Sequence, residues 1–521
     1  MADAPPARPR WILHPALLAA AFVLEVALAN KVEPAGFARA LGIAILAGIG
    51  LTLAAWGITR DRCIGGLVAT TLVLATISII PLYFAWSALQ SAFGPTPALA
   101  TFGVVLFLSI ALPAVQRVRV QRGASPMRGP ATSVLNRFAA VLVVVVVAFH
   151  AGPDLPGAVA NALGPRETVT VAPVSDLPDM YVLLLDGYPR ADVLERRFGI
   201  DNSAFLAELG DLGFDVATDS HSNYDFTQLT MASMFQMRHL EDVDGLRALI
   251  GVPGGHVNAL RNALIDSPGF ATLEAAGYQI VVTQPGYDHV ALRGVADRVL
   301  EHGEMNDLER DVLKRTWLLD PLGALMPTFF TGPPRDRVVH AFDDLSEVVQ
   351  DGSAKPVFAW VHVPAPHLPL VLDADGRALE LDPRRFDGYD ASGFGMTDAE
   401  FAAAYADEIT YLNARVIGAA RALSSALGRP DPVIVIMSDH GYATAVADGP
   451  ARLSNLFAAY TPRAPGLLAD ARTPVNLMAI LFNRFLGTEF PLSADRYFLS
   501  PSITEVLELT EVHVPDPAAD S

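Results

Sequence analysis

The sequence predicts two folds in one chain: an N-terminal α-helical bundle of five transmembrane spans and a C-terminal α/β sandwich with a mostly parallel sheet. Hydrophobic residues make up 51% of the 521 residues, and the mean hydropathy is +0.34. This is too apolar for an ordinary soluble protein of this size. The long apolar runs end by residue 151, whereas shorter strand-like and helix-like patterns alternate after residue 180.

Five apolar segments precede residue 152, at 11–30, 40–58, 64–89, 98–115 and, more thinly, 138–149. No later run approaches the roughly 20 residues that a bilayer crossing needs. The first segment lacks a small-residue cleavage site of signal-peptide type, so we expect it to be retained as a span. Glu25 lies within it. An intramembrane carboxylate is a functional candidate, although its place near the outer end also fits an interfacial or helix-packing role.

Basic residues in the short loops predict the orientation, because Lys and Arg resist translocation. They gather before the first span, between the second and third spans, and between the fourth and fifth. These residues are Arg8, Arg10, Arg60, Arg62, Arg117, Arg119, Arg122, Arg128 and Arg137. The opposite loops hold only Lys31 and Arg39. We therefore expect a multi-pass cell-membrane protein with a cytoplasmic N-terminus and everything after residue 152 on the extracytoplasmic, periplasmic side.

Charge and cysteine content exclude several classes of function. Residues 1–150 carry 11 Lys or Arg against 4 Asp or Glu, whereas the remainder carries 26 against 52. An acidic outer domain disfavours binding to nucleic acid, because the phosphate backbone binds to basic surfaces. The single cysteine, Cys63, lies at the inner end of the third span. A disulfide framework, a cysteine-based zinc site and a cysteine nucleophile are therefore all excluded from the outer domain.

We expect four regions in the chain. Residues 1–151 form the transmembrane domain, and the Pro- and Gly-rich residues 152–179 form a juxtamembrane linker. Residues 180–510 form the extracytoplasmic domain, and residues 511–521 are a tail.

Within the outer domain, apolar runs at 180–185, 278–284, 356–363 and 432–437 have the length of buried strands. Helical patterns occupy 202–213 and 398–427. Such alternation favours an α/β sandwich around a mostly parallel sheet. Ligands of such sheets bind beyond the carboxyl ends of the strands, so the residues that leave each strand are the ones to inspect.

Three of these strands end in residues that can bind a metal. Asp186 follows "MYVLLL", and Asp439 and His440 follow "PVIVIMS". His362 ends "PVFAWVH", and His367 comes after the Pro-rich turn. Carboxylate oxygens combined with imidazole suit Mn²⁺, Zn²⁺ or Mg²⁺. We therefore expect one divalent metal ion at this edge of the sheet.

Thr227 is the candidate nucleophile. The stretch "HSNYDFTQLTMASMFQM" predicts a loop that enters a helix near this residue, where free backbone N–H groups and the helix dipole favour an anion. A hydroxyl bound to a metal there can ionise near neutral pH and attack phosphorus.

Each residue also has a plain structural interpretation when it is taken alone. Asp186, followed by Gly, fits an Asx-turn, and Thr227 fits a helix N-cap. Asp439 and His440 fit a solvated strand end, and His362 fits a core histidine. Only their occurrence together favours a functional site.

The order of these motifs resembles the alkaline phosphatase superfamily in its sulfatase-like branch. The residues that carry this resemblance are Asp186 after the first strand, the hydroxyl of Thr227 at a helix start, the His of "VPAPHLP" and then "SDHG". Five spans before such a domain resemble lipoteichoic acid synthases and membrane phosphoethanolamine or phosphoglycerol transferases. The stretches "ARLSNLFAAYTPR" and "TPVNLMAILFNRFLG" are also similar, so the resemblance covers roughly residues 180 to 500.

That resemblance implies an α/β domain of alkaline phosphatase type and a role for each matching residue. The ligands of one divalent metal would be Asp186, Thr227, Asp439 and His440. The substrate contacts would be His362, His367, Arg452 and Asn455. Thr227 would be the catalytic nucleophile, and His367 would contact the phosphoryl oxygens or protonate the leaving alcohol.

The sequence departs from the pattern of these families at several points. No cysteine is present outside the membrane region for a formylglycine, which excludes sulfate-ester hydrolysis by that route, and Gly187 stands where such sulfatases have a second aspartate. The D-x-x-x-H spacing of two-metal phosphatases is missing, which favours one metal. Lipoteichoic acid synthases carry Glu where this chain has Asp186. Phosphoethanolamine transferases usually have outer-domain disulfides, so that subgroup is disfavoured.

Location limits the reaction. Outside the membrane there is no ATP, so a transferase must take its group from an existing phosphodiester such as a phospholipid head group. We expect transfer of a phosphoalcohol, for example phosphoglycerol, to an envelope glycan or lipid through a phospho-threonine. Two alternatives stay open: a phosphodiesterase or phosphatase that uses water as acceptor, and a non-catalytic, membrane-anchored binding subunit.

Overall fold

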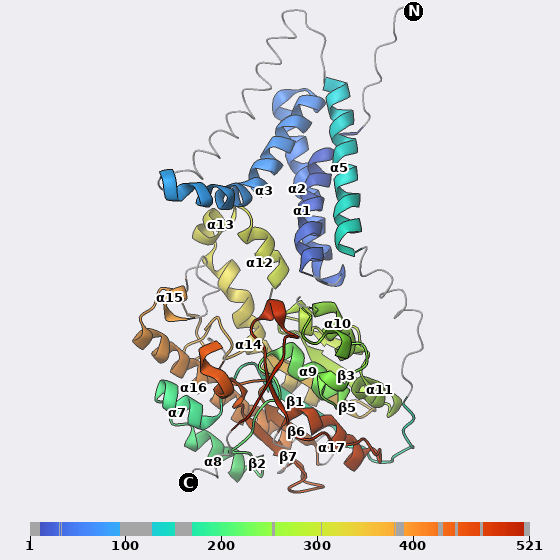
Figure 1. Cartoon of the computed structure of the whole chain (residues 1–521), viewed down its shortest axis with the longest axis vertical. Helices are drawn as coiled ribbons and strands as arrows, with labels where there is room; N and C mark the ends of the chain where they lie inside the picture. The colour runs from blue at the N-terminus through green and yellow to red at the C-terminus, as the bar shows by residue number, and fades with distance from the viewer. Residues whose placement is uncertain are drawn as a thin grey trace, which may run out of the picture. The chain divides into compact units, whose positions relative to one another are not determined.

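The computed structural model describes residues 11–30, 32, 34–93, 128–151, 169–252, 256–303, 305–379, 381, 390–425, 431–442, 446–468 and 473–514 (Figure 1). The chain divides into two compact units. The first unit is Met1–Pro165 with Met305–Met326, and the second unit is Arg166–Glu304 with Pro327–Ser521. The segment at 305–326 thus joins the first unit, a grouping that the sequence-based boundaries do not include.

Four long apolar helices form the body of the first unit. They are α1 (His14–Ala29), α2 (Pro34–Thr59), α3 (Arg62–Phe93) and α5 (Arg128–Ala151). They fall on four of the five expected spans. The expected span at 98–115 lies outside the described residues, so the count of five stays a prediction.

Two of the described helices are long and apolar enough to cross a membrane: α2, and the portion Ala131–His150 of α5, each with a hydropathy of 2.1. The stretches His14–Ala29 and Arg62–Ile77 are shorter apolar helices. Large apolar side chains on the two long helices face outward; Ile43, Leu46, Val141 and Val144 are 59 to 68% exposed. Helices that are apolar on all sides suit a lipid environment.

Helix α1 packs against α2, α3 and α5, and polar contacts fix its two ends. At its start, the Asn136 side chain of α5 accepts hydrogen bonds from the backbone N–H groups of Leu13 and His14, both at 3.0 Å. Toward its end, Glu25 lies 2.9 Å from the Nε2 of His150. The pairing of Glu25 with a neighbouring helix matches the helix-packing alternative for this residue.

A seven-stranded sheet in the order β2-β7-β6-β1-β5-β3-β4 organises the second unit. The strands are β1 (Met180–Leu185), β2 (Asp215–Val216), β3 (Gln279–Thr283), β4 (Arg298–Leu300), β5 (Val357–Val363), β6 (Val433–Met437) and β7 (Phe457–Tyr460). The five strands from β6 to β4 are parallel, whereas β7 is antiparallel to both β6 and β2. The predicted mostly parallel sheet is therefore confirmed.

Two layers of helices cover the sheet. Alternate residues of β1 pack into opposite cores, because successive side chains of a strand point to opposite faces: Met180, Val182 and Leu184 into one, and Tyr181, Leu183 and Leu185 into the other. The first core contains α9 (Thr227–Gln236), α10 (Val257–Ile265), α11 (Pro268–Ala275) and α17 (Leu477–Phe485). The second contains α7 (Ala191–Phe198), α8 (Ser203–Asp211), α14 (Pro327–Asp351), α15 (Ala391–Phe394) and α16 (Asp398–Ser424).

Short elements complete the second unit. A separate pair, β8 (Tyr497–Leu499) and β9 (Thr510–Val512), is antiparallel, so β9 runs two residues into the expected tail. The 3-10 helices are Leu240–Asp242, Arg247–Leu249, Asp288–Val290, Val446–Leu453, Pro474–Asn476 and Ile503–Glu505.

Candidate functional site

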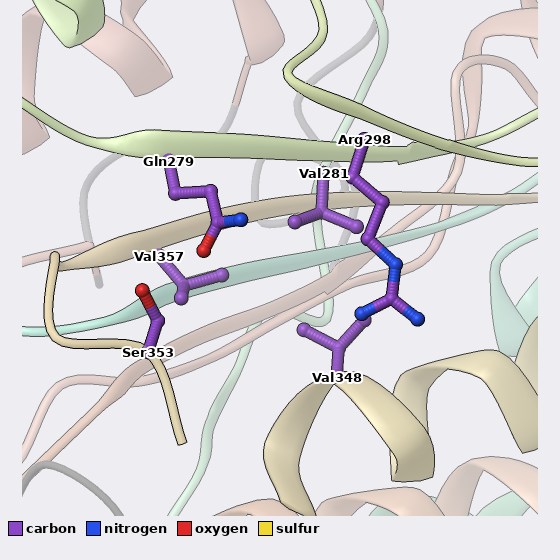
Figure 2. A pocket seen from close by; sticks show the side chains of 6 residues that line it. All are labelled: Gln279, Val281, Arg298, Val348, Ser353 and Val357. Carbon is purple, nitrogen blue, oxygen red and sulfur yellow. The ribbon is translucent and has the colours of Figure 1, made fainter. Parts of the chain in front are cut away.

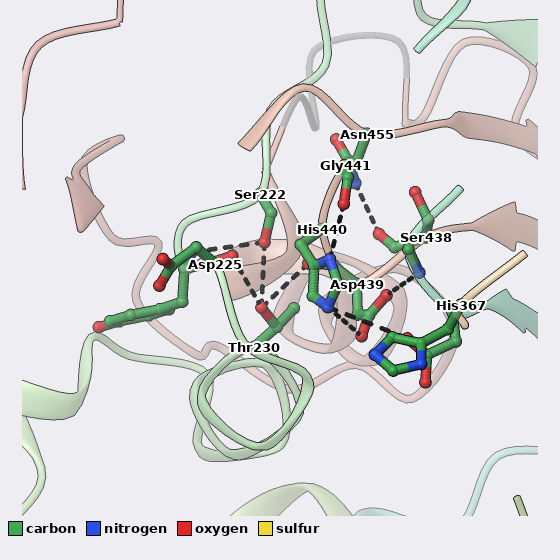
Figure 3. Close-up of polar contacts among 12 residues, drawn as sticks. Ser222, Asp225, Thr230, His367, Ser438, Asp439, His440, Gly441 and Asn455 are labelled. Atoms are coloured by element: carbon green, nitrogen blue, oxygen red, sulfur yellow. Dashed lines mark hydrogen bonds and ion pairs between the residues drawn. The ribbon is translucent and has the colours of Figure 1, made fainter. Parts of the chain in front are cut away.

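The central strands deliver the predicted residues to one edge of the sheet. In the register of the sheet, Leu184 pairs with His362 on β5 and with Met437 on β6. Asp186, directly after β1, therefore lies between the ends of β5 and β6. Asp439 and His440 follow β6 and lie next to His367 in Figure 3. The expectation that these strand ends meet is confirmed.

Asp186, Asp439 and His440 form a cluster that could hold a metal ion, with one ligand atom of each lying within 4.8 Å of the others. The Nε2 of His440 lies 3.4 Å from Asp439 Oδ2 and 3.9 Å from Asp186 Oδ1. All three side chains are at most 3% exposed.

Each of these three side chains has one polar atom fixed by the protein and a second that faces the other two. Asp439 Oδ1 accepts the Gly187 N–H at 2.9 Å, and Asp186 Oδ2 accepts from His362 Nε2 at 3.1 Å. His440 Nδ1 donates to the Gly441 carbonyl at 2.8 Å, which leaves Nε2 with its lone pair. Among the described residues, no hydrogen bond reaches Asp186 Oδ1 or Asp439 Oδ2, although both are buried. Two unsatisfied carboxylate oxygens facing one imidazole nitrogen fit a divalent cation.

Charge at the cluster also fits a cation. Burial opposes ionisation of Asp186, but nearby imidazoles, first that of His367, hold its pKa well below the ordinary value. Burial likewise opposes protonation of His440, but the Asp439 and Asp186 carboxylates outweigh it and raise the His440 pKa. The two carboxylates thus place negative charge around His440 Nε2, where a bound cation would take the place of a proton.

Hydrogen bonds and close backbone packing fix the turn after β6 that presents Asp439 and His440. The Ser438 hydroxyl donates to the Tyr188 carbonyl at 2.6 Å, and Asn455 Nδ2 donates to the Ser438 carbonyl at 2.7 Å. A Cβ on Gly441 would press on the backbone carbonyls of Ala451, Arg452 and Ser454. Asn455 is fully buried, so its observed contacts hold this turn, and its predicted contact with substrate stays a prediction.

Thr227 is the first residue of α9, after an extended Phe226. One turn later on the same helix, the Thr230 hydroxyl donates to the Asp439 carbonyl at 3.0 Å (Figure 3). Because residues three apart share a helix face, this bond brings the start of α9 to the metal-ligand cluster. Within the described part of the chain, the Thr227 hydroxyl makes no hydrogen bond, and the residue is 9% exposed.

Arg452 lies against the segment that leads into α9. Its Nη1 is 3.1 Å from Asp225 Oδ2, and its guanidinium carbon lies 5.1 Å from the centre of the Phe226 ring. Asp225 is fully buried, and burial raises its pKa despite the Arg452 charge. The contacts of Arg452 thus hold Asp225 and Phe226, the two residues before Thr227, in place. The sequence alone predicts no role for Asp225.

His367 lies beside the cluster, with its ring centre 6.5 Å from that of His440. Its Nδ1 is 2.8 Å from the Leu368 carbonyl and 3.4 Å from the Tyr287 hydroxyl. The shorter contact makes Nδ1 the donor to the carbonyl, so Nε2 is the nitrogen available to a substrate.

Tyr287 and His289 belong to this site but were not predicted from the sequence. They follow β3, the strand beside β5, and the two rings stack with centres 5.9 Å apart. Burial lowers the pKa of His289 to about 4, so this imidazole is neutral at neutral pH. The same inspection of strand ends, extended to "YQIVVTQPGYDH", could have found both.

A separate cavity of about 300 Å³ is lined by Gln279, Val281, Arg298, Val348, Ser353 and Val357 (Figure 2). Gln279 and Val357 begin β3 and β5. The cavity therefore lies toward the amino ends of the strands, opposite the edge that carries the metal-ligand cluster.

No family model matches the chain, and no curated protein matches its sequence. Several solved structures are similar. The C-terminal periplasmic domain of EcEptC from Escherichia coli has 12% identity and a TM-score of 0.44, over 68% of this chain and 99% of that one. The integral membrane protein lipooligosaccharide phosphoethanolamine transferase A (EptA) from Neisseria meningitidis has 14% identity and a TM-score of 0.38, over 89% and 95%.

A 2-O GAG sulfatase has 12% identity and a TM-score of 0.38, over 62% of this chain and 77% of that one. These proteins fall in the sulfatase-like branch that the motifs resemble, and they include phosphoethanolamine transferases, the subgroup that the missing outer-domain cysteines disfavoured. Because all three TM-scores are below 0.5, the function of this chain is argued from its own residues.

Proposed function

We propose that the chain is a membrane-bound, metal-dependent phosphotransferase that moves a phosphoalcohol head group from a phospholipid to an extracytoplasmic glycan or lipid. The observation that carries this proposal is the convergence of two free carboxylate oxygens and a free imidazole nitrogen beside the start of α9. Asp186, Asp439 and His440, joined by Thr227, would hold Mn²⁺, Zn²⁺ or Mg²⁺. Such an ion lowers the pKa of a bound hydroxyl and neutralises charge on phosphoryl oxygens.

The ionised hydroxyl of Thr227 attacks phosphorus in the donor lipid. The bond from phosphorus to the diacylglycerol oxygen breaks, and that oxygen takes a proton from Nε2 of His367. The phosphoalcohol is then esterified to Thr227. An acceptor hydroxyl loses its proton to His367, attacks phosphorus, and releases the Thr227 oxygen. Because one phosphodiester replaces another, the exchange needs little driving force.

Positioning residues support these steps. His362 orients Asp186 through its hydrogen bond, and Arg452 fixes the backbone before Thr227 through Asp225. Tyr287 and the neutral His289 lie at the same edge, where they would donate to a phosphoryl oxygen or to the head-group alcohol. The helices of the first unit expose apolar side chains, which fits a protein that takes its donor phospholipid from the surrounding membrane. We place the N-terminus in the cytoplasm and the second unit outside.

Mass spectrometry tests the proposal directly. The full-length protein, loaded with Mn²⁺ or Zn²⁺, is incubated with labelled phosphatidylglycerol or phosphatidylethanolamine and candidate glycan acceptors. We expect a phosphoalcohol adduct on Thr227 and its transfer to the glycan. Thr227→Ala should abolish both, whereas the exposed control Thr410→Ala on α16 should leave both unchanged.

Other outcomes point to the two alternatives. Release of the head group to water alone would identify a phosphodiesterase. Absence of an adduct and of turnover with any phosphodiester, in protein that binds metal, would contradict an enzymatic role and favour a binding subunit.

A further inference from the structure

Residues 305–326 are flanked in sequence by the second unit but pack within the first. They contain two short helices, α12 (Asp307–Lys314) and α13 (Leu319–Leu325). Helix α12 contacts both α1 and α2. A segment that leaves the acidic α/β domain therefore docks on helices of the apolar bundle.

Apolar packing anchors this segment. Leu308 is 3% exposed and belongs to one buried cluster with Val26, Ala27 and Val32. These three residues lie at the end of α1 and in the turn that leads to α2. The docking position is thus the end of the α1–α2 hairpin, not the middle of the helices.

Polar contacts fix the same position. The Asn306 side chain donates to the Gly36 carbonyl at 2.8 Å, and both carboxylate oxygens of Glu309 accept from the Arg39 guanidinium. Asn306 and Glu309 also form the capping box that starts α12. Such reciprocal capping stabilises the first turn of a helix, so the same residues both build α12 and attach it to α2.

The remainder of the segment presents apolar side chains to its surroundings. Trp317 is 36% exposed, Leu325 78% and Met326 45%. The docked end of α2 is the first turn of a helix of 26 residues with a hydropathy of 2.1. At about 1.5 Å per residue such a helix exceeds the roughly 30 Å hydrocarbon core, so its first turn lies at a membrane surface. Tryptophan is enriched at that level of a bilayer.

We propose that residues 305–326 form an interfacial segment that docks on the end of the α1–α2 hairpin and lays Trp317, Leu325 and Met326 on the phospholipid surface around it. The occupant is lipid because the segment docks at the end of α2 that lies at the membrane surface and exposes a tryptophan and two large apolar side chains there. This proposal depends on the first unit lying in a bilayer and not on the proposed reaction.

Spin-label accessibility tests the proposal in the full chain. The single natural cysteine is replaced by Cys63→Ala, a nitroxide is attached at Leu325→Cys, and the protein is placed in nanodiscs of phosphatidylethanolamine and phosphatidylglycerol. Collision rates are then measured with oxygen, which concentrates in lipid, and with Ni-EDDA, which stays in water. Val141→Cys, on the lipid-facing side of α5, and Leu492→Cys, exposed in the second unit, serve as lipid and water references.

We expect the label at 325 to have an oxygen to Ni-EDDA ratio several-fold above that at 492 and closer to that at 141. Leu308→Asp, which removes the apolar anchor, should move the ratio toward that of 492. A label at 325 that matches 492 would overturn the proposal. Low collision with both reagents would also overturn it, because protein, such as a second copy of the chain, would then cover the surface.

Discussion

Asp186 can direct Oδ1 toward His440 because His362 holds its other carboxylate oxygen. The His362 imidazole is 1% exposed, so water does not replace it as a donor. Outer hydrogen-bond partners of this kind set the orientation and basicity of metal ligands. We therefore expect His362 to act as a positioning residue, whose loss acts through Asp186.

His362→Ala should weaken metal affinity about 10- to 100-fold, the range typical for loss of such a partner. Competition with a chelator, monitored by metal content of the full chain, measures this change. His302→Ala is a matched control, because His302 makes the same kind of bond, 2.8 Å to Asp344, away from the site. Equal affinities in the His362 and His302 variants would show that Asp186 needs no such support.

Glu408 predicts a pH dependence of stability that is unrelated to the site. It is fully buried on α16, and burial raises its pKa from 4.5 to about 8 despite a hydrogen bond from the Val371 backbone. Between these values the unfolded chain releases the proton that the folded chain retains. The free energy of unfolding therefore falls as pH rises through this window, by up to about 1.4 kcal/mol per pH unit.

Glu408→Gln should remove this slope. The thermal midpoint of the variant minus that of the native chain should therefore increase from pH 5 to pH 8. Thermal unfolding in detergent at several pH values checks this expectation. Glu195→Gln, at an exposed position of α7, should leave the slope as it is. A native and a Glu408→Gln chain with parallel pH profiles would contradict the prediction.

Individual residues were predictable where a strand directly precedes them. Asp186, His362, Asp439 and His440 each end or follow a continuous apolar run, and parallel strands bring such ends together. Residues whose position depends on packing between distant segments were not predictable from the sequence. Asp225 is defined by Arg452, more than 200 residues away in sequence, and the position of His289 depends on the sheet order that places β3 beside β5.

At the scale of elements, the turn after β6 depends on the absence of a side chain at residue 441. The Gly441 N–H donates to the Arg452 carbonyl at 2.6 Å, and a Cβ would lie 2.9 Å from the Ala451 carbonyl oxygen. Backbone atoms on this side cannot rotate away as a flexible side chain can. The turn therefore has to shift if residue 441 gains a methyl group, and the carbonyl that fixes His440 shifts with it.

Gly441→Ala should destabilise the second unit by about 1 to 3 kcal/mol, as overpacking does, and should reduce metal affinity as well. Gly418→Ala is the control, since Gly418 is exposed within α16 and a Cβ added there would meet nothing within 4 Å. That variant should gain about 0.5 to 1 kcal/mol of stability and keep its metal affinity. Denaturant unfolding and chelator competition measure both properties, and unchanged metal binding in Gly441→Ala would refute the argument.

The sequence predicted β1, β3, β5 and β6 to within two residues because each is a continuous apolar run buried on both faces. It did not predict β2, β4 or β7, which have two to four residues. Strands this short have no periodicity of their own and depend on pairing with a neighbour. The docking of residues 305–326 could not be predicted from the sequence either, because Leu308 and Glu309 contact residues of the α1–α2 hairpin that lie far away in the chain.

At the scale of the whole molecule, charge and docking favour the same orientation. The chain after residue 150 is strongly acidic, whereas Arg60 and Arg62 flank the turn between α2 and α3. The opposite end of α2 contacts residues 305–326, which are flanked by the second unit in sequence. If α2 crosses the bilayer, the α2–α3 turn and this docked segment lie on opposite sides.

Cys63, beside that turn, makes the orientation testable with the natural sequence. In sealed membranes of native orientation, a membrane-impermeant maleimide should leave Cys63 unlabelled, because Arg60 and Arg62 hold this turn in the cytoplasm. In a Cys63→Ala background, Leu492→Cys should be labelled from outside. Inverted membranes should reverse the result, and detergent should expose both residues. Labelling of both cysteines from one side would contradict the proposed topology, because residues on either side of an odd number of crossings cannot share a compartment.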